Sequence, residues 1–482
     1  MQTLIPQPVT ANARYLGRAG WMLGFGLSSR ALLLLVAGVL WAIPAFFHPH
    51  RIWMMLVWDG MIALLVVIDG MALPIPFSIA VTRRFLHSPA LGERTVVEYE
   101  VVQSWKGIVT VSVTDDLHPA LIAKPRTLTV VAYPRDAVRT VLECYPGQRG
   151  DFRLGKIYLR YCGALRLVER WAVCDAEQDV RVFPASEQSG DKAAFYLMRA
   201  RQIELQKRRL RLRGIGREFE SLRDYQSGDE LRNISWTATA RRAKLITRQF
   251  TTERSQQVWI VLDAGRLSRT AFELRRDRPT AGESEQETAE KLQLSVTQLD
   301  QATTAAVMLA QVIGGSGDKF ALLSYGRRVQ QQLLPGNGPV HLRMMINLLS
   351  QVRSEAAEAN HLNAASRLKN LQRRRGLVIW ITEIAESAGR PEVMSAVAEL
   401  VRRHLVVLVL LEHPELDVLA VRDPKNVEEM FASTAAQEML ERRRETIAKL
   451  RQQGVLVVET TPAEVGASAI SKYLEVKAQG LL

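Results

Sequence analysis

The stretch VWIVLD, Val258–Asp263, contains five consecutive apolar residues and ends on an aspartate. A short apolar run without alternation, rich in β-branched residues, is typical of a parallel strand that is covered on both faces. Similar runs recur along the rest of the chain, at Lys319–Tyr325, Leu377–Ile384, Leu405–Leu411 and Val455–Thr460. The C-terminal half is therefore expected to be built on a parallel sheet.

Segments with a helical apolar pattern separate these strands. They are Thr288–Ile313, Val340–Gln351, Ala364–Leu371, Pro391–His404 and Asn426–Gln453. Val329–Leu334 follows the turn at Gly326 and is expected to be an antiparallel edge strand. The alternation of strand and helix predicts a doubly wound, mostly parallel α/β domain over residues 255–482.

Ligands of such domains bind beyond the carboxyl ends of the strands. No glycine-rich phosphate loop follows any of the predicted strands, and no nucleophile is grouped with a base. Asp263 and Glu383 each end a predicted strand, so we expect the two carboxylates to lie at one edge of the sheet.

This arrangement resembles a von Willebrand factor A domain. The resemblance implies a metal-ion-dependent adhesion site, with D-x-S-x-S after the first strand, a threonine from another loop, and T-D after a later strand. Here Gly265 and Leu267 replace the two serines, Glu383 replaces the second aspartate, and Ser268 is one position out of register. Because Mg²⁺ requires about six oxygen ligands, we expect a degenerate site at Asp263, Ser268 and Glu383. We therefore expect no cofactor, with Mg²⁺ as the alternative.

A polar stretch precedes this domain, GIGREFESLRDYQSGDELRNISWTATAR at residues 214–241. It closely resembles the signature of the bacterial "domain of unknown function 58" family. The resemblance extends over the chain and includes an R-G-x-[FY] turn, Arg149–Phe152 here. It implies a transmembrane hairpin, a β-rich module, a von Willebrand A-like domain, and a MoxR-type AAA+ ATPase as partner. The signature residues singled out are Arg223, Asp224, Tyr225, Gly228, Asp229, Arg232, Trp236 and Arg241.

Ser227 and Glu230 have the spacing of a capping box, which predicts a helix over about Gly228–Arg241. Two interpretations of the signature remain open. In the first, Arg223, Asp224, Arg232 and Arg241 form a buried ion-pair clamp and the ring of Trp236 lies in the core. In the second, the stretch is a recognition surface for an ATPase or its client.

A cationic segment leads into the signature. Residues 191–254 hold sixteen Lys and Arg against eight Asp and Glu, and Lys192–Arg213 has a helical pattern. A solvated helix bridging two domains, a helix lying on anionic lipid, and a nucleic-acid-binding helix are the three interpretations. Few aromatic residues alternate with the cations, so no nucleic-acid partner is expected.

Residues 78–186 change to a two-residue periodicity. The expected strands are Thr95–Val102, Ile108–Val113, Leu128–Tyr133, Ala137–Leu142 and Arg153–Arg160, separated by turns. Short strands at this spacing predict an all-β, sandwich-like module. Such a module packs or presents surfaces, and it contains no catalytic set.

Two apolar runs precede this module, Ala31–Phe47 and Ile52–Phe77, joined by His48–Arg51. They predict a transmembrane helical hairpin over residues 31–77, after a cytoplasmic segment at 1–30. Arginines flank the pair at positions 14, 18, 30, 83 and 84. The positive-inside rule therefore puts both termini and the folded domains in the cytoplasm. Asp59, within the second run, is expected to face the partner helix or another subunit.

Length and composition support a multidomain protein, and the family resemblance together with the apolar runs implies the bacterial inner membrane. The chain has 482 residues, a net charge of +13 and three cysteines without a C-x-x-C pair. We expect boundaries at 1–30, 31–77, 78–186, 187–254 and 255–482. The favoured function is a non-enzymatic, membrane-anchored interaction protein that works with the ATPase on an unknown protein client. The alternatives are a metal-dependent hydrolase using Asp263 and Glu383, and a nucleic-acid binder using residues 191–254.

Overall fold

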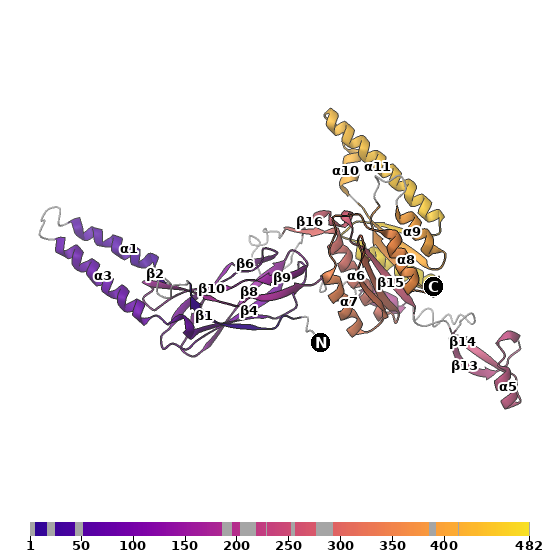
Figure 1. Ribbon diagram of the computed structural model, residues 1–482, viewed down its shortest axis with the longest axis horizontal. Helices are drawn as coiled ribbons and strands as arrows, with labels where there is room; N and C mark the ends of the chain where they lie inside the picture. The colour runs from indigo at the N-terminus through magenta and orange to yellow at the C-terminus, as the bar shows by residue number, and fades with distance from the viewer. Residues whose placement is uncertain are drawn as a thin grey trace. The chain divides into compact units, whose positions relative to one another are not determined.

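A computed structural model describes residues 5–16, 25–43, 52–185, 195–202, 218–227, 229–251, 256–275, 293–384, 392–412 and 414–481. The chain divides into two compact units, Met1–Phe183 and Pro184–Leu482 (Figure 1). Each unit has its own buried core, and the two are described in turn.

The first unit combines strands with a pair of apolar helices. Its helical segments are α1 (Ser29–Gly38), η1 (Val39–Ala42), α3 (Trp53–Ala72) and η3 (Pro76–Ser78). Its strands are β1 (Val9–Tyr15), β2 (Phe25–Leu27), β3 (Ile79–Phe85), β4 (Thr95–Gln103), β5 (Val109–Asp115), β6 (Leu121–Lys124), β7 (Thr127–Ala132), β8 (Ala137–Pro146), β9 (Gly150–Leu154), β10 (Ile157–Cys162), β11 (Val168–Cys174) and β12 (Gln178–Val182).

Ten of these strands form one antiparallel array in the order β6-β8-β4-β3-β1-β11-β10-β5-β7, with β2 added beside β11. Alternate residues of its strands point into a common apolar core. Arg83 is fully buried in this unit, and its guanidinium is paired with the Asp115 carboxylate. Burial raises the pKa of Asp115, while Arg83 opposes that shift. The unit is therefore β-rich, as the two-residue periodicity predicted.

Two details of this unit differ from expectation. β1 lies in the middle of the array, paired with β3 and β11. Part of the segment expected as a separate unit, residues 1–30, thus belongs to the β fold, because its own alternation was overlooked beside the apolar run. The single strand expected at Arg153–Arg160 is two strands, β9 and β10. They separate at Gly155, whose backbone bonds with Asp116 instead of continuing the ladder.

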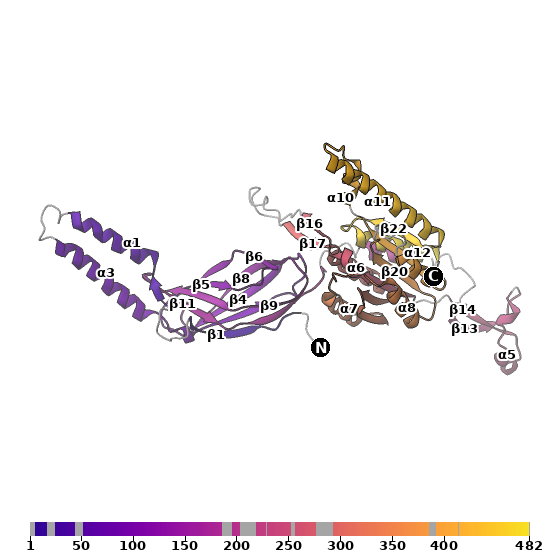
Figure 2. The same ribbon diagram turned by 45° about the horizontal axis from the view of Figure 1, so that its top comes forward.

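The helix pair meets the β fold where α1 begins and α3 ends (Figures 1 and 2). The Asp69 carboxylate of α3 accepts from the backbone N–H groups of Leu167 and Val168, at 2.9 and 3.0 Å. Ser28, the N-cap of α1, donates from its backbone to the Leu167 carbonyl at 2.9 Å. The start of α1 and the end of α3 are therefore held by the same short segment.

Among the described residues, one helix is long and apolar enough to cross a membrane, Trp53–Ala72, with a mean hydropathy of 1.9. α1 is shorter than the run expected from Ala31 to Phe47, and residues 44–51 of the expected hairpin lie outside the described residues. Asp59 faces α1 at Gly38. Two of the flanking arginines that carried the orientation argument are ion-paired within the β fold, Arg14 with Asp175 and Arg83 with Asp115.

The second unit contains a small hairpin and an α/β domain. The hairpin has β13 (Glu218–Asp224), η4 (Leu231–Asn233), α5 (Trp236–Arg242) and β14 (Ile246–Thr251). The α/β domain has β15 (Gln257–Asp263), η5 (Arg266–Arg269), β16 (Ala271–Arg275), β17 (Gln293–Thr297), α6 (Gln298–Gly315), β18 (Lys319–Tyr325), β19 (Val329–Gly336), α7 (Pro339–Gln351), α8 (His361–Leu371), β20 (Leu377–Thr382), α9 (Glu392–Val401), β21 (Leu405–Leu411), α10 (Pro414–Val421), α11 (Val427–Gln452), β22 (Leu456–Thr460) and α12 (Val465–Gln479).

The central sheet has the order β19-β18-β15-β20-β21-β22. All its pairs are parallel except β18 with β19, the edge strand expected from the sequence. Residues 258, 260 and 262 of β15 join the core beneath α6, α7 and α12. Residues 259 and 261 join the core beneath α8, α9 and α11. Both faces of the sheet are therefore covered, which is why the strands read as continuous apolar runs.

Part of the predicted basic helix lies against this domain. Residues 195–202 are helical, Ala200 is buried in the core beneath α6, and Tyr196 packs on the same core. The inner face of this segment is thus part of the α/β domain, because an apolar residue recurs there every three to four positions. The rest of the predicted helix, residues 192–194 and 203–213, lies outside the described residues.

Candidate functional site

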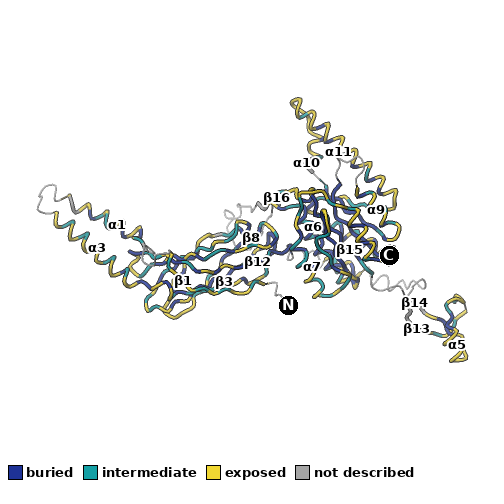
Figure 3. The backbone as a smooth tube through the Cα atoms, viewed as in Figure 1, coloured by how far each residue is buried: buried dark blue, intermediate teal, exposed yellow. Residues whose placement is uncertain are grey.

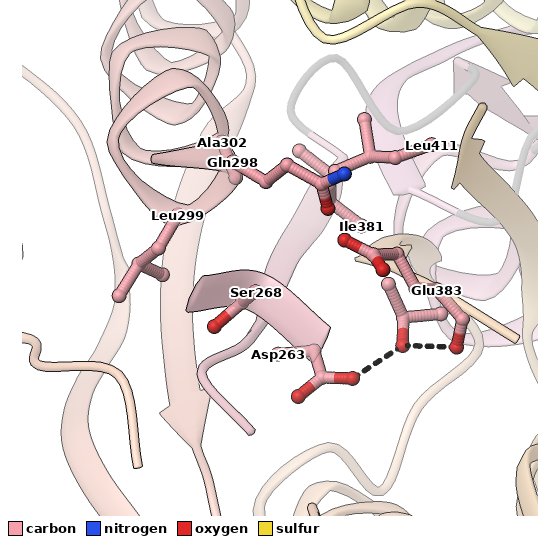
Figure 4. A pocket seen from close by; sticks show the side chains of 9 residues that line it. Asp263, Ser268, Gln298, Leu299, Ala302, Ile381, Glu383 and Leu411 are labelled. Carbon is pink, nitrogen blue, oxygen red and sulfur yellow. Dashed lines mark hydrogen bonds between the residues drawn. The ribbon is translucent and has the colours of Figure 1, made fainter. Parts of the chain in front are cut away.

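The first candidate site is the sheet edge at the carboxyl ends of β15 and β20. These two strands run parallel, with Leu262 opposite Ile381, so Asp263 and Thr382 emerge side by side. Glu383 follows directly, and the start of α6 brings Gln298 over the same place. Figure 4 shows Asp263, Ser268, Gln298 and Glu383 around one small cavity. The structure thus brings together the residues predicted from strand ends.

The Asp263 carboxylate is occupied by neighbouring donors. Oδ2 accepts from the Thr382 hydroxyl at 2.6 Å, and Oδ1 accepts from the Gly265 N–H at 2.8 Å. Burial raises the pKa of Asp263, while nearby His361 and these two hydrogen bonds oppose the shift. Both oxygens therefore tie β15 to β20 and to the loop that follows β15.

The other polar groups at the edge are also engaged. The Ser268 hydroxyl donates to the Gly265 carbonyl at 2.7 Å. The side-chain amide of Gln298 lies directly against the buried Glu383 carboxylate. Gln298 had no signal in the sequence, since it opens a helix and follows no motif. Thr382 was visible in the Ile381–Glu383 run but was not assigned a role.

The arrangement does not fit an octahedral Mg²⁺ ion. The cavity measures about 10 Å³, near the lower limit for one water molecule. A side chain at Gly265 would place its Cβ 2.8 Å from Cβ of Ala359 and from the Ala359 backbone nitrogen. The loop around Ala359 therefore occupies the space that a ligating serine at position 265 would need. Within the described residues, no three His, Cys, Asp or Glu side chains are grouped as metal ligands.

Nucleophilic chemistry has no support at this edge. The described residues that line the cavity include no His, Cys or Lys, and the Ser268 hydroxyl is directed to a backbone carbonyl. His361 instead shares a hydrogen bond of 2.8 Å with the Tyr325 hydroxyl. The Thr382 hydroxyl does meet a carboxylate, that of Asp263, at 2.6 Å. Thr382 is buried, so this pair is not exposed to a substrate as the nucleophile and base of acyl or phosphoryl transfer would need to be.

The second candidate site is the signature hairpin, β13–β14 with η4 and α5 between the strands. The helix expected from Gly228 begins at Trp236 instead. Glu230 is the residue that precedes the 3-10 turn Leu231–Asn233. Ser227 caps no helix because the chain turns back at Gln226, whose N–H donates to Asp229 Oδ2 at 3.0 Å. Gly228 lies outside the described residues.

The charged signature residues pair locally. Arg223 donates to Asp229 at 2.7 Å, and Arg232 donates to Glu230 at 2.8 Å. The hydrogen bond from the Gln226 backbone, followed by the contact with Arg223, lowers the pKa of Asp229. Asp224 and Arg241 make no ion pair within the described part of the chain, and both are exposed. The expected network of Arg223, Asp224, Arg232 and Arg241 is therefore replaced by two separate pairs.

The apolar signature residues divide between the hairpin interior and its surface. Ile234 and Ile246 are buried, and Tyr225 is half-buried with its N–H bonded to the Leu245 carbonyl. Trp236 and Leu231 are 67% and 69% exposed. The tube of the hairpin is largely yellow, the colour of exposed residues, around α5 (Figure 3). Trp236 was expected in the core. It is instead the first residue of α5, on the outer side of a unit too small to enclose it.

Comparison with known proteins gives one family and several distant structures. Residues 221–453 match the family described as "Protein of unknown function DUF58". The conserved hypothetical protein BatB from Bacteroides thetaiotaomicron is 14% identical, over 47% of this chain and 100% of its own, with a TM-score of 0.27. The SpRpn10 VWA domain is 9% identical, over 45% and 95%, with a TM-score of 0.23. An uncharacterized membrane spanning protein from Vibrio fischeri is 13% identical, over 46% and 99%, with a TM-score of 0.16. No curated protein matches the sequence.

Proposed function

We propose that this chain, whose residues 221–453 match the DUF58 family, is a non-enzymatic, membrane-anchored interaction protein. In this proposal the folded units lie on the cytoplasmic side of a bacterial inner membrane. A von Willebrand A-like α/β domain serves as the scaffold, and a MoxR-type AAA+ ATPase is the partner. The client on which the two would act is a protein.

The observation that carries the proposal is the exposed face of the signature hairpin. Trp236 and Leu231 present large apolar side chains to solvent, and the same hairpin carries the exposed cations Arg232, Arg241 and Arg242. Tryptophan and arginine are the residues that most often dominate the binding energy of protein interfaces. The hairpin therefore suits recognition of an acidic protein face with an apolar pocket.

The closed sheet edge supports the absence of catalysis. The Thr382 hydroxyl is bonded to Asp263, the Ser268 hydroxyl is bonded to the Gly265 carbonyl, and the cavity beside them is about 10 Å³. A substrate would have to break these hydrogen bonds before it met a reactive group. We accordingly propose that neither a metal nor another cofactor takes part.

Membrane anchoring is supported by the apolar α3, whose side chains are largely exposed along the helix. Exposed leucine, valine and isoleucine over twenty residues have a length that fits a bilayer core. We propose that α1 and α3 cross the membrane as a hairpin with both ends in the cytoplasm. A reporter fused to the C-terminus should then be active in the cytoplasm, and activity confined to the periplasm would contradict this topology.

Site-specific crosslinking tests the proposed partner. A photoreactive amino acid at position 236 of the full-length chain, in its native membrane, should capture the ATPase. The same amino acid at Leu334, an exposed apolar residue on β19, is the matched control. Equal capture from both positions, or capture from Leu334 alone, would contradict the assignment of the hairpin as the docking surface.

A further inference from the structure

A second cavity, of about 250 Å³, lies in the first unit where α1 leaves the β fold. Its lining is polar and cationic, with three arginines and one acid, Arg30, Arg160, Arg166 and Glu169. Hydroxyl groups of Ser28, Ser29, Thr110 and Ser112 complete the polar lining. The cavity is far larger than the one beside Asp263, and no role described above uses it.

The floor of the cavity is the outward face of three adjacent strands, β5, β10 and β11. Cys162 stands opposite both Thr110 and Glu169, and Arg160 in the next row stands opposite Ser112. One wall is the turn between β10 and β11, and the other is the start of α1. The floor is therefore built on a hydrogen-bonded sheet.

The wall is held in a defined conformation. Arg166 has a φ of 55°, which is uncommon for a residue with a side chain. The Ser28 hydroxyl donates to the Arg166 carbonyl at 2.5 Å, and the Ser28 N–H donates to the Leu167 carbonyl. These bonds fix the turn against α1 and direct the Arg166 guanidinium toward Thr110, whose hydroxyl lies 3.4 Å away.

The cations exceed the acids in this cavity. Arg160 and Glu169 are 3.7 Å apart, a loose pair that leaves the guanidinium able to bind another anion. Arg30 makes no ion pair among the described residues. At the start of α1, the Ala31 N–H donates to the Ser28 hydroxyl at 3.3 Å. The N–H groups of Ser29 and Arg30, two residues that line the cavity, have no partner within the helix. Arginine guanidinium groups, hydroxyls and helix-start N–H groups together are the donors that bind phosphate.

We propose that this cavity binds the phosphate group of a phospholipid with a net negative headgroup. Arg30 and Arg166 supply the charge, Arg160 is positioned by Glu169, and the start of α1 supplies backbone donors. The phosphate chemistry follows from the cavity itself. The lipid as its source rests on the membrane insertion of α1 and α3 proposed above.

The level of the cavity along the helices supports a lipid over a free phosphate. The Trp105 indole N–H donates to the carbonyl of Ala72, the last residue of α3, at 2.9 Å. The Trp171 ring lies against Gly26, just before α1 begins, and Phe77 is exposed nearby in sequence to the end of α3. Tryptophan and other aromatic residues gather where a membrane meets water. The arginine cavity thus lies beside the aromatic residues that would mark the headgroup layer.

Cys162 gives a built-in reporter of occupancy. It lines the cavity and is partly exposed, whereas Cys144 and Cys174 are fully buried. Burial raises the pKa of the Cys144 and Cys174 thiols to about 12, so these two form little of the reactive thiolate. Burial also raises the pKa of the Cys162 thiol, so it is the partial exposure of Cys162 that should make a maleimide modify it selectively. A bound headgroup should slow that alkylation.

The experiment measures the alkylation rate of Cys162 in the full-length chain. The chain is placed in phosphatidylglycerol nanodiscs, in phosphatidylcholine nanodiscs, and in an uncharged maltoside detergent with or without inorganic phosphate. Phosphatidylglycerol should slow the reaction about tenfold relative to phosphatidylcholine, which corresponds to about 1.4 kcal/mol. Inorganic phosphate in detergent should slow it far less.

Two variants separate charge from structure. Arg160→Gln should remove most of the difference in Cys162 alkylation rate between phosphatidylglycerol and phosphatidylcholine. Arg139→Gln should keep it, because Arg139 is also an exposed strand arginine paired with a glutamate, Glu100, but lies outside the cavity. Each variant is judged by the ratio of its Cys162 alkylation rates in the two lipids. A change in the intrinsic reactivity of the thiol cancels in this ratio.

The outcomes distinguish this proposal from membrane anchoring. Equal rates in all four conditions would overturn the anion site, even if the chain resists extraction from membranes. Slowing by inorganic phosphate as large as that by phosphatidylglycerol would overturn the lipid as the source. If alkaline carbonate extracts the chain from membranes and phosphatidylglycerol does not slow the alkylation, the proposed membrane insertion of α1 and α3 is wrong.

Discussion

The sheet edge at Asp263 and the signature hairpin are both rich in polar residues, yet they use them in opposite ways. At the edge, the buried Thr382 hydroxyl donates to Asp263, and Gln298 lies against the buried Glu383 carboxylate. On the hairpin, Arg232 and Glu230 pair in solvent, and Trp236 is exposed. The motif that resembles a metal site is therefore a structural junction, and the stretch that resembles a clamp is a surface.

The difference follows from where each group sits relative to a core. β15 and β20 are the central strands of a covered sheet, so a polar group at their ends must find a protein partner. The hairpin has two strands and one short helix, which enclose Ile234 and Ile246 and leave little room for more. Large side chains outside this small interior, such as those of Leu231 and Trp236, remain in solvent. There they are available to a partner.

The largest expected contrast compares two tryptophans. Trp380 lies in β20 with 1% exposure and donates to the Tyr325 hydroxyl at 2.8 Å. Trp380→Ala should destabilise the second unit by about 3–5 kcal/mol because it leaves a cavity in the core. Trp236→Ala should change stability by less than about 0.5 kcal/mol, as surface substitutions do. Denaturant unfolding of both variants measures the contrast, and equal losses would show that the hairpin is also a core element.

A smaller effect is expected at the edge itself. Asp263→Ala removes the acceptor of both the Thr382 hydroxyl and the Gly265 N–H, and should cost about 1–3 kcal/mol. Thr382→Val should recover part of that loss in the double variant, because it removes one of the stranded donors. The exposed Asp224→Ala is the control on the hairpin. If Asp263→Ala has the same free energy of unfolding as wild type, the interpretation of the edge as a structural junction is wrong.

The acid stability of the second unit should depend on His404. This histidine is buried, neither of its ring nitrogens has a hydrogen-bond partner among the described residues, and burial lowers its pKa. The unfolded chain binds this proton below about pH 6.5, whereas the folded chain takes it up at lower pH. Stability from the neutral ring is thus present above that pH and is lost as pH falls through the folded pKa.

His404→Leu should therefore flatten the decline of stability between about pH 7 and pH 5. The exposed His87→Leu should leave the decline unchanged. Unfolding midpoints of the three proteins across this range provide the measurement. An identical pH profile in wild type and His404→Leu would show that the ring is not held neutral.

The smallest effect concerns metal. Saturating Mg²⁺ would stabilise a chain that binds it by about 2.7 kcal/mol at a hundredfold excess over Kd. We expect no shift of the unfolding midpoint with Mg²⁺ or with EDTA, in wild type or in Glu383→Gln. Micromolar Mg²⁺ binding by calorimetry that is lost in Glu383→Gln would restore the adhesion-site interpretation.

The strands of the α/β domain could be predicted because a strand that is buried on both faces consists of consecutive apolar residues. The runs at Val258–Asp263 and Leu405–Leu411 correspond closely to β15 and β21. The partners of Asp263 could not be predicted, since Gln298 and Ala359 reach the edge from distant segments. Only the fold shows that Ala359 closes the space beside Gly265.

Short elements were harder to predict. β1 has seven residues before an apolar helix, and its place between β3 and β11 depends on strands far along the chain. The capping-box spacing at Ser227 competed with a tight turn at Gln226–Asp229, and the turn won because Asp229 binds both the Gln226 N–H and Arg223. Local spacing allowed both structures, and the contacts across the hairpin selected one.

The most direct test of the central claim is capture of the MoxR-type ATPase by the full-length chain carrying Trp236→Ala. Arg232→Ala serves as a second variant of the same surface. If the hairpin is the docking surface, both variants keep the wild-type unfolding midpoint and lose at least about tenfold in affinity for the ATPase. If both unfold well below wild type while the folded fraction still binds the ATPase, the signature is a structural clamp and the account is wrong.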